Sequence, residues 1–320
     1  MDPTWPAAAG AVGAVGGRPV TLFLALVLDA LLGEPKWLWS RMPHPAVLMG
    51  NLITHATSMF NHAPHQKPKG VILCIGLAGL GGLAGLVLAQ LGPLAEILVT
   101  AILVAQRSLM QHVQDVAQSL RLSLPAGRRS VAMIVGRDTA QMDAPQVARG
   151  AIESAAENFS DGIAAPVFWF ALAGLPGVII YKMINTADSM IGYKNETYRD
   201  FGWACARLDD LLNWAPARLS AFGIWLITGC RTSWATIISE AKLHRSPNAG
   251  WPEAAMAYAL DISLSGPRSY EGKFEKFPWV NAAGRKNIGP VEIEKSIQTL
   301  WLTWGAMTLL VAGMTLAFLL

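Results

Sequence analysis

Four charged side chains recur every four residues in the stretch APQVARGAIESAAENFSDG, namely Arg149, Glu153, Glu157 and Asp161. Because residues four apart lie on one face of a helix, they form a single charged stripe. Asp143 and Gln146 predict a capped start for that helix. A solvated helix face with an ordinary Arg149–Glu153 ion pair is an alternative. Against it, Asp161 stands directly before an apolar run, where an idle carboxylate is costly.

A second polar group interrupts the apolar sequence YKMINTADSMIGYKNE. Lys182, Asn185 and Ser189 share one helical face, and Asp188 is adjacent to it. A lysine supplies a point charge for a phosphate, and a carboxylate is a hard oxygen ligand for a metal. The pattern favours a buried phosphate or metal site, although an ordinary polar contact between helices would also explain it.

A third group lies in ARLDDLLNWAPARL, where Asp209, Asp210 and Asn213 fall within one helical turn between Arg207 and Arg218. Mg²⁺ keeps waters and substrate phosphates among its ligands, so two carboxylates and an amide are enough to hold it. The sequence contains no GxxxxGK[ST], HExxH or GxSxG motif. Any nucleotide phosphates must therefore be held by scattered lysines, arginines and Mg²⁺.

The elements that position these groups are helices in a membrane. The 320 residues are 52% hydrophobic and only 15% charged, whereas soluble domains carry about 25% charged residues. Uncharged or nearly uncharged apolar runs occupy residues 20–32, 71–91, 93–105, 163–181, 219–239 and 299–320. We predict an all-α fold, a polytopic integral membrane helical bundle of about five segments (four to six), with polar helical loops forming the active site.

Composition shifts along the chain predict its organisation. Residues 1–17 form a disordered tail, and residues 18–320 form a single membrane-embedded catalytic domain. Within that domain the core motifs occupy residues 135–218, a polar helical segment occupies 240–298, and a membrane helix occupies 299–320. The net charge of +3 is spread over the loops, so a nucleic-acid partner is not expected.

Glycines predict two local features of the helices. Gly81 and Gly85 fit the small-xxx-small pattern of close helix packing. The sequence AGLPG at residues 173–177 permits the apolar run 163–181 to break and re-enter instead of crossing the bilayer. We favour re-entry, because a single crossing would place the two polar halves of the core on opposite faces.

Long motifs link the chain to a known family. They are GRDTAQMD, ESAAENFSDG, YKMINTADSMIGYKNE, ARLDDLLNWAPARL and SPNAGWPEAAMAYAL, with GEP…HPAVLMGNLI and LSGPRSYEGK in addition. Over nearly all of residues 29–290 the chain resembles the adenosylcobinamide-phosphate synthase family of cobalamin biosynthesis (CobD/CbiB). The resemblance implies an enzyme of the bacterial inner membrane, multi-pass, with its active site facing the cytoplasm.

The resemblance also implies a reaction. It would join adenosylcobyric acid to (R)-1-amino-2-propanol or its O-phosphate through an amide, with ATP as co-substrate and Mg²⁺ as cofactor. An acyl phosphate intermediate is a hypothesis that explains how the carboxylate accepts an amine. Expected partners are the corrinoid, the aminopropanol (phosphate) and membrane lipid; a homo-oligomer and other late corrin-pathway membrane enzymes are left open. The alternatives are a Mg²⁺-dependent prenyl or alcohol phosphotransferase and a non-enzymatic corrinoid-binding membrane protein.

Hypothetical roles for individual residues follow from the resemblance. Glu153 or Glu157 would take the proton of the attacking ammonium, with Asp161 and Lys182 also in the catalytic set. Mg²⁺ would be positioned by Asp188, Asp209 and Asp210. Phosphate charge would be balanced by Lys182, Lys194 and Arg207. The remaining substrate- or phosphate-binding candidates are Arg137, Asp138, Asn158, Asn185, Asn195, Arg218 and Asn248.

Overall fold

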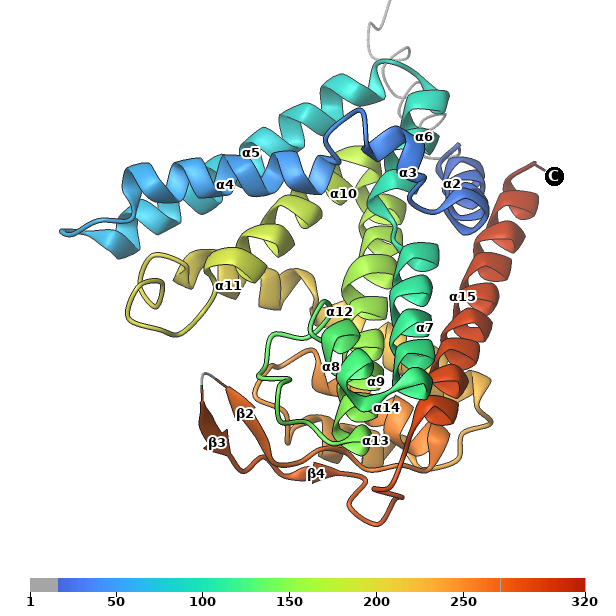
Figure 1. Ribbon diagram of the computed structural model, residues 1–320. Coiled ribbons are helices and arrows are strands. Elements are labelled where there is room, and N and C mark those ends of the chain that lie inside the picture. Colours follow the sequence, from blue (N-terminus) through green and yellow to red (C-terminus); the bar gives the residue numbers. More distant parts are fainter. Residues whose placement is uncertain (1–16, 271, 320) are drawn as a thin grey trace, which may run out of the picture. The chain divides into compact units, whose positions relative to one another are not determined.

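The computed structural model describes residues 17–270 and 272–319 (Figure 1). The predicted disordered tail, residues 1–17, lies outside this part except for Gly17. The helices are α2 (Arg18–Leu32), α3 (Lys36–Trp39), α4 (Pro45–Phe60), α5 (Gln66–Ala89), α6 (Pro93–Leu103), α7 (Gln106–Leu122), α8 (Leu124–Val131), α9 (Ala144–Phe159), α10 (Ala165–Ile191), α11 (Trp203–Leu212), α12 (Trp214–Ile227), α13 (Trp234–Ala241), α14 (Gly250–Leu260) and α15 (Pro290–Leu319).

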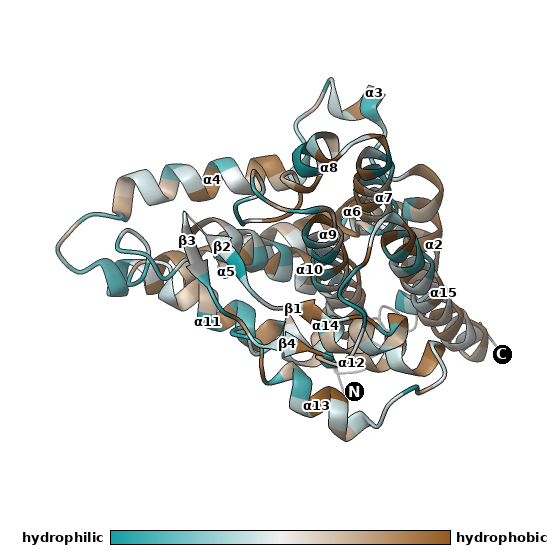
Figure 2. Cartoon of the chain, turned by 60° about the horizontal axis from the view of Figure 1, so that its bottom comes forward, coloured by the Kyte–Doolittle hydropathy of each residue, from teal (hydrophilic) through white to brown (hydrophobic). Residues whose placement is uncertain are grey.

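Four helical stretches among the described residues are long and apolar enough to cross a membrane: Gln66–Ala89, Pro93–Leu122, Ala144–Ile191 and Pro290–Ala317. Figure 2 shows the hydrophobic colouring of such helices, for example α15. The prediction of a polytopic helical membrane protein is confirmed. The apolar run at residues 219–239 is not one helix, however. Gly229 and Cys230 adopt positive φ and separate α12 from α13, and the 14 residues of α12 are too few to span a bilayer.

The chain folds into two compact units, which are described separately. Unit 1 comprises residues 17–105, 165–212 and 307–319. Its principal contact joins α5 to α10. A Cβ atom on Gly85 would lie 2.3 Å from Pro176 Cα, and one on Gly81 would lie 3.2 Å from Ile180 Cα. The backbones can therefore approach only because these positions are glycine, and the predicted small-residue packing is confirmed.

A backbone break divides α10 within unit 1. Gly174 has φ 65° and ψ −154°, a conformation essentially restricted to glycine, and Pro176 follows inside the helix. Arg18 Nη1 donates to the carbonyl of Leu172 at 2.9 Å and so satisfies a group next to the break. At its start α10 meets the end of α11, because Trp169 Nε1 donates to the carbonyl of Leu212 at 3.1 Å. The break predicted from AGLPG is thus confirmed.

Unit 2 comprises residues 106–164 and 213–306, of which residue 271 is not described. Its helix α9 begins at the predicted capping box: the N–H of Gln146 donates to Asp143 Oδ1 at 2.8 Å, and the N–H of Asp143 donates to Gln146 Oε1 at 2.7 Å. A π-helical turn, Ser160–Ala164, ends α9. Helix α14 packs against α9, α12 and α13. These helices surround the polar side chains considered below.

Part of the expected helical segment 240–298 is not helical. It contains the short strands β1 (Leu264–Ser265), β2 (Arg268–Tyr270), β3 (Lys273–Glu275) and β4 (Trp279–Val280). β1 pairs antiparallel with β4, and β2 with β3. Gly266 and Gly272 take positive φ at the turns, and Pro267 and Pro278 have no N–H to donate within a helix. These residues end the helical pattern. They place β2, which carries Arg268, beside Glu153 of α9.

Candidate functional site

Glu153 is the centre of a buried ion-pair network in unit 2. Its side chain lies on α9 and is 5% exposed. Oε2 accepts from Arg137 Nη2 and from Arg268 Nη1, the latter at 3.2 Å, while Oε1 accepts from the backbone N–H of Ser265 at 2.6 Å. Arg268 also donates to Ser265 Oγ at 2.6 Å. One carboxylate thus holds together three segments that are separate in the sequence: the loop before α9, α9 itself and the β1–β2 turn.

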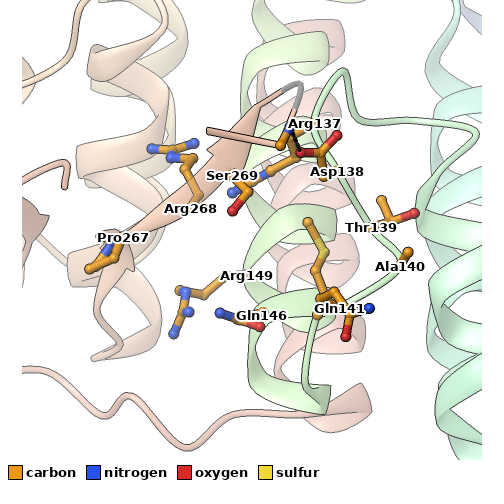
Figure 3. Close-up of a pocket in the computed structure, with 12 residues that line it drawn as sticks. Arg137, Asp138, Thr139, Ala140, Gln141, Gln146, Arg149, Pro267, Arg268 and Ser269 are labelled. Atoms are coloured by element: carbon orange, nitrogen blue, oxygen red, sulfur yellow. Dashed lines mark hydrogen bonds between the residues drawn. The ribbon is translucent and has the colours of Figure 1, made fainter. Parts of the chain in front are cut away.

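A pocket of about 740 Å³ adjoins this network in unit 2 (Figure 3). Three of its lining residues are arginines, Arg137, Arg149 and Arg268. The carboxylate among its described lining residues, Asp138, accepts from the backbone N–H of Gly272 at 2.7 Å and so joins the loop after residue 135 to the β2–β3 turn. The volume is in the range of small-molecule sites. The excess of guanidinium groups favours an anionic ligand.

Arg149 differs from the other two arginines of the pocket. It is 7% exposed, and its guanidinium lies over the ring of Trp279, 4.8 Å from the centroid. Within the described chain it has no hydrogen bond or ion pair to its guanidinium, whereas Arg137 and Arg268 both bind Glu153. The alternative of an exposed Arg149–Glu153 pair is therefore wrong, because Glu153 is buried and takes its cations from elsewhere.

A second buried carboxylate, Glu253 on α14, lies near this network. Burial, together with the charge of Glu153, raises the pKa of Glu253 well above its usual range. His244 Nε2 is 3.7 Å from Glu253 Oε2. Burial and the charge of Arg268 lower the pKa of His244 to about 4. His244 is therefore neutral at neutral pH, and its contact with Glu253 is not an ion pair there.

Arg218 occupies an aromatic clamp in unit 2. Its guanidinium lies 4.5 Å from the ring centroids of both Trp214 and Trp251. It donates to Asn248 Oδ1 at 3.3 Å and to the carbonyl of Trp214 at 2.6 Å. Burial lowers the pKa of Arg218, but a guanidinium stays charged at neutral pH. The structure therefore brings together two of the predicted substrate-binding residues, Arg218 and Asn248.

Unit 1 contains the second and third polar groups of the sequence. Asn185 Nδ2 donates to Asp209 Oδ1 at 3.1 Å, which joins α10 to α11. Arg207 Nη2 lies 2.9 Å from Asp210 Oδ2. Burial raises the pKa of Asp210, and the charges of Arg207 and Lys194 oppose that rise. Asp188 is within electrostatic reach of Asp210 and Arg207. These residues form one cluster of carboxylates, cations and an amide.

Lys182 lies on α10, the helix that also carries Asn185 and Asp188. Its charge acts on His44, whose pKa is lowered by burial, an effect that Glu34 opposes. His44 itself caps α4 by accepting from the N–H of Ala46 at 3.2 Å.

The other predicted residues are dispersed. Asn195 accepts from the N–H of Tyr198 at 3.0 Å and Asn158 donates to the carbonyl of Ser154 at 2.9 Å, so both bind nearby backbone. Glu157 is exposed near the end of α9, and Asp161 lies on the π-helical turn.

The carboxylates of the unit 1 cluster suit a Mg²⁺ site that waters and substrate phosphates complete. They suit a site made only of protein ligands less well. The described part of the chain contains no group of three or more His, Cys, Asp or Glu side chains placed to hold a metal by themselves. Asp209 already accepts from Asn185, and Asp210 is paired with Arg207. Mg²⁺ is commonly bound by one or two carboxylates, with waters and substrate phosphates completing the shell. The donor set fits that arrangement.

Comparisons with known proteins identify the family. The family described as CobD/Cbib protein matches residues 22–300. The chain belongs to this family. It is 46% identical to the cobalamin biosynthesis protein CobD of Rhizobium meliloti (strain 1021), over 93% of this chain and 97% of the relative. The proteins of the same name from Brucella suis biovar 1 (strain 1330) and Rhodobacter capsulatus are 44% and 41% identical, over 93% and 91% of this chain and 97% and 95% of the relatives. No solved structure matches.

Several residues of this CobD/Cbib chain join the site without having been predicted from the sequence. They are Arg149 as a pocket residue, Arg268, Ser265, His244 and Glu253. Two signals pointed toward them. Arg268 lies in LSGPRSYEGK, a motif that also carries the family resemblance, and Glu253 lies in SPNAGWPEAAMAYAL. A charged residue that lies in a long family motif, between glycines and prolines, can be expected at a functional site. The spacing of polar residues alone did not give this expectation for Arg268 and Glu253.

Proposed function

We propose that this chain acts in cobalamin biosynthesis as an adenosylcobinamide-phosphate synthase. It would form an amide between adenosylcobyric acid and (R)-1-amino-2-propanol or its O-phosphate, with ATP as co-substrate. Support comes from the family and from relatives named cobalamin biosynthesis protein CobD. The structural observation that carries the proposal is the Arg137–Glu153–Arg268 network, because it joins three of the long motifs beside a pocket suited to an anion.

The reaction requires an activated carboxylate. A free carboxylate has no good leaving group, so the proposal includes transfer of the γ-phosphoryl group of ATP to it, which forms an acyl phosphate and ADP. Attack by the neutral amine then forms the amide and releases inorganic phosphate, while the ammonium proton goes to a base. Mg²⁺, when bound, would neutralise phosphate charge and orient the transferred group. Asp188, Asp209 and Asp210 would hold it, and Lys194 and Arg207 would contact the phosphates.

Of the two candidate bases, Glu157 suits proton transfer better than Glu153. Both oxygens of Glu153 already accept hydrogen bonds, and two of the donors are arginines. Such a carboxylate is a weak base, because protonation would cost those interactions. Glu157 lies one turn further along α9 and is exposed. In this proposal Glu157 accepts the proton, and Glu153 keeps Arg137 and Arg268 in place.

The localisation is part of the same proposal. The membrane would be the bacterial inner membrane, with the site on its cytoplasmic side, where ATP is available. The partners would be the corrinoid and the aminopropanol or its phosphate, together with membrane lipid.

The test is amide formation by the purified, detergent-solubilised chain. It receives adenosylcobyric acid, MgCl₂, ATP and either aminopropanol or its O-phosphate, and products are identified by mass. ATP-dependent appearance of adenosylcobinamide or its phosphate is the expected result. Binding of the corrinoid without product from either amine would reject the enzyme and favour a corrinoid-binding membrane protein. Omission of ATP and boiled protein serve as controls.

A further inference from the structure

We infer that the arginine pocket of unit 2 is a phosphate-binding subsite, and that Arg149 is its principal unpaired donor. The inference rests on the proposed function for the identity of the substrates but not for the site itself. Three guanidinium groups line the pocket. Among the described residues, Asp138 also lines it, and Glu153 pairs with two of the three arginines. Asp143 and Glu153 act on Arg149 through their charges, but neither forms an ion pair with it.

Among the described residues, the buried guanidinium of Arg149 has no hydrogen-bond acceptor. Such a group is costly, because burial removes its water without replacing the lost hydrogen bonds. The indole of Trp279 covers one face of the group but accepts no hydrogen bond in its plane. The planar N–H groups therefore remain available to a ligand in the pocket, and a phosphate offers the oxygen geometry that such a fork binds in pairs.

The other two arginines are held in place before a ligand arrives. Arg137 and Arg268 bind the same oxygen of Glu153, and Arg268 is fixed further by Ser265 Oγ. Figure 3 shows Arg149 and Gln146 together on one side of the pocket, with the Arg137–Asp138 loop on another. Holding donors in position in advance lowers the entropic cost of binding. The pocket thus has the properties of a built anion site, not of a surface cluster of basic residues.

Two substrates of the proposed reaction carry phosphate, the phosphorylated amine and ATP. The chemistry of the pocket is the same for both, so the experiment must distinguish them. Calorimetry on the purified full-length chain in detergent would measure binding of aminopropanol O-phosphate, of free aminopropanol and of metal-free ATP. None of these measurements requires turnover, so a failed synthase assay would leave the result for the pocket intact.

The decisive variant is Arg149→Gln. We expect it to weaken binding of one phosphate compound roughly 10- to 100-fold, the effect of losing hydrogen bonds from a charged donor. Binding of free aminopropanol should not change. Loss for the phosphorylated amine assigns the pocket to the amine substrate, and loss for ATP assigns it to the nucleotide. Unchanged binding of both, or an equal loss for free aminopropanol, would overturn the inference.

Two further variants guard against indirect effects. Arg149→Lys keeps the charge but not the two-pronged donation, so its loss of affinity should be smaller than that of Arg149→Gln. Arg129→Gln removes one positive charge from the same unit, outside the pocket lining. Its phosphate affinity should equal that of the wild type. Equal losses in Arg129→Gln and Arg149→Gln would show a general effect of net charge and contradict a specific subsite.

Discussion

Glu153 accepts from two arginines and a backbone N–H, which makes it a positioning residue in our proposal. We predict that Glu153→Gln raises KM for the phosphate-bearing substrate roughly tenfold, because Arg137 and Arg268 lose their common anchor. The variant should also unfold more easily, since two buried arginines then share an uncharged partner. Steady-state kinetics and thermal unfolding in detergent measure both effects.

The pH profile separates positioning from proton transfer. In Glu153→Gln the acid limb of kcat should persist, whereas in Glu157→Gln kcat should fall by roughly 10²- to 10⁴-fold and the limb should disappear. Glu153→Asp, which keeps the charge, should recover part of the lost KM. Loss of the acid limb in Glu153→Gln with a normal Glu157→Gln enzyme would reverse the two assignments.

His244 predicts how stability depends on pH. Its folded pKa of about 4 is below the value of 6.5 that an unfolded chain has. Between these values the unfolded state binds a proton that the folded state does not, so stability is present above pH 6.5 and is lost as pH falls toward 4. The loss from this group is about 3 kcal/mol. Thermal unfolding across this range and up to neutral pH should show it.

Two variants isolate this effect. His244→Asn retains an acceptor for the N–H of Ser246 but cannot titrate, so its stability should depend less on pH in the acid range. Glu253→Gln should instead change how stability depends on pH as the pH rises. Because the folded pKa of Glu253 is raised, the folded state holds a proton that the unfolded state releases as pH rises above about 4.5, and the amide removes that cost. An unaltered acid slope in His244→Asn would contradict the prediction.

The sequence predicted residue types better than residue partners. Spacing placed Arg149 and Glu153 on one stripe of α9, and the structure has them there. It did not indicate that Glu153 would pair with Arg268, because that contact depends on how the chain returns across 115 residues. Conversely, DDLLN and NTADS were predicted as separate groups, and Asn185 joins them through Asp209. Pairing across such distances is set by tertiary packing, which local periodicity does not encode.

At the scale of elements, the contact of α5 with α10 gives a prediction with an internal control. Gly85→Ala should destabilise unit 1 by roughly 1–3 kcal/mol, because the new methyl group meets the backbone of Pro176, which cannot rotate away. Gly79→Ala, on the same helix with nothing within 4 Å of the added Cβ, should be neutral or slightly stabilising. Unfolding in mixed detergent micelles measures both, and equal destabilisation would contradict the contact.

Helix starts and breaks were predictable from short sequence signals, but the strands were not. The Asp143–Gln146 capping box and the break at Gly174 both have local causes, a side-chain acceptor and a glycine-only backbone conformation. The strands β1–β4 contain only two or three residues each. They are too short for an alternating pattern, and β1 is held by α9 and α14 packed against it.

At the scale of the whole molecule, one set of contacts restricts how the chain meets the membrane. Arg137 and Asp138 precede the candidate span Ala144–Ile191, whereas Arg268 and Gly272 follow it. Through Glu153 and Asp138 these residues are linked within unit 2. The described residues between 192 and 289 contain no candidate span. Because the contacts of Glu153 and Asp138 join the segments before and after Ala144–Ile191, we predict that these segments share one side of the membrane.

A helix that crossed once would not satisfy this prediction, whereas a chain that turns back at Gly174 would. Gly174 breaks α10, and Trp169, which precedes the break, donates to the carbonyl of Leu212 at the end of α11. Non-helical backbone at membrane depth is tolerated where it is buried in protein, and Gly174 is buried. We therefore predict a re-entrant segment, with the polar groups before and after it on one face of the membrane.

Cysteine labelling in membrane vesicles tests this topology. In a background without other cysteines, Met133→Cys and the native Cys230, both exposed, should react with a membrane-impermeant maleimide from the same side. His62→Cys and Leu91→Cys, at opposite ends of the span Gln66–Ala89, should react from opposite sides and calibrate the assay. Labelling of Met133→Cys and Cys230 from opposite sides would mean that Ala144–Ile191 crosses fully. The Glu153 network could not then form, because its arginines would be separated by the bilayer.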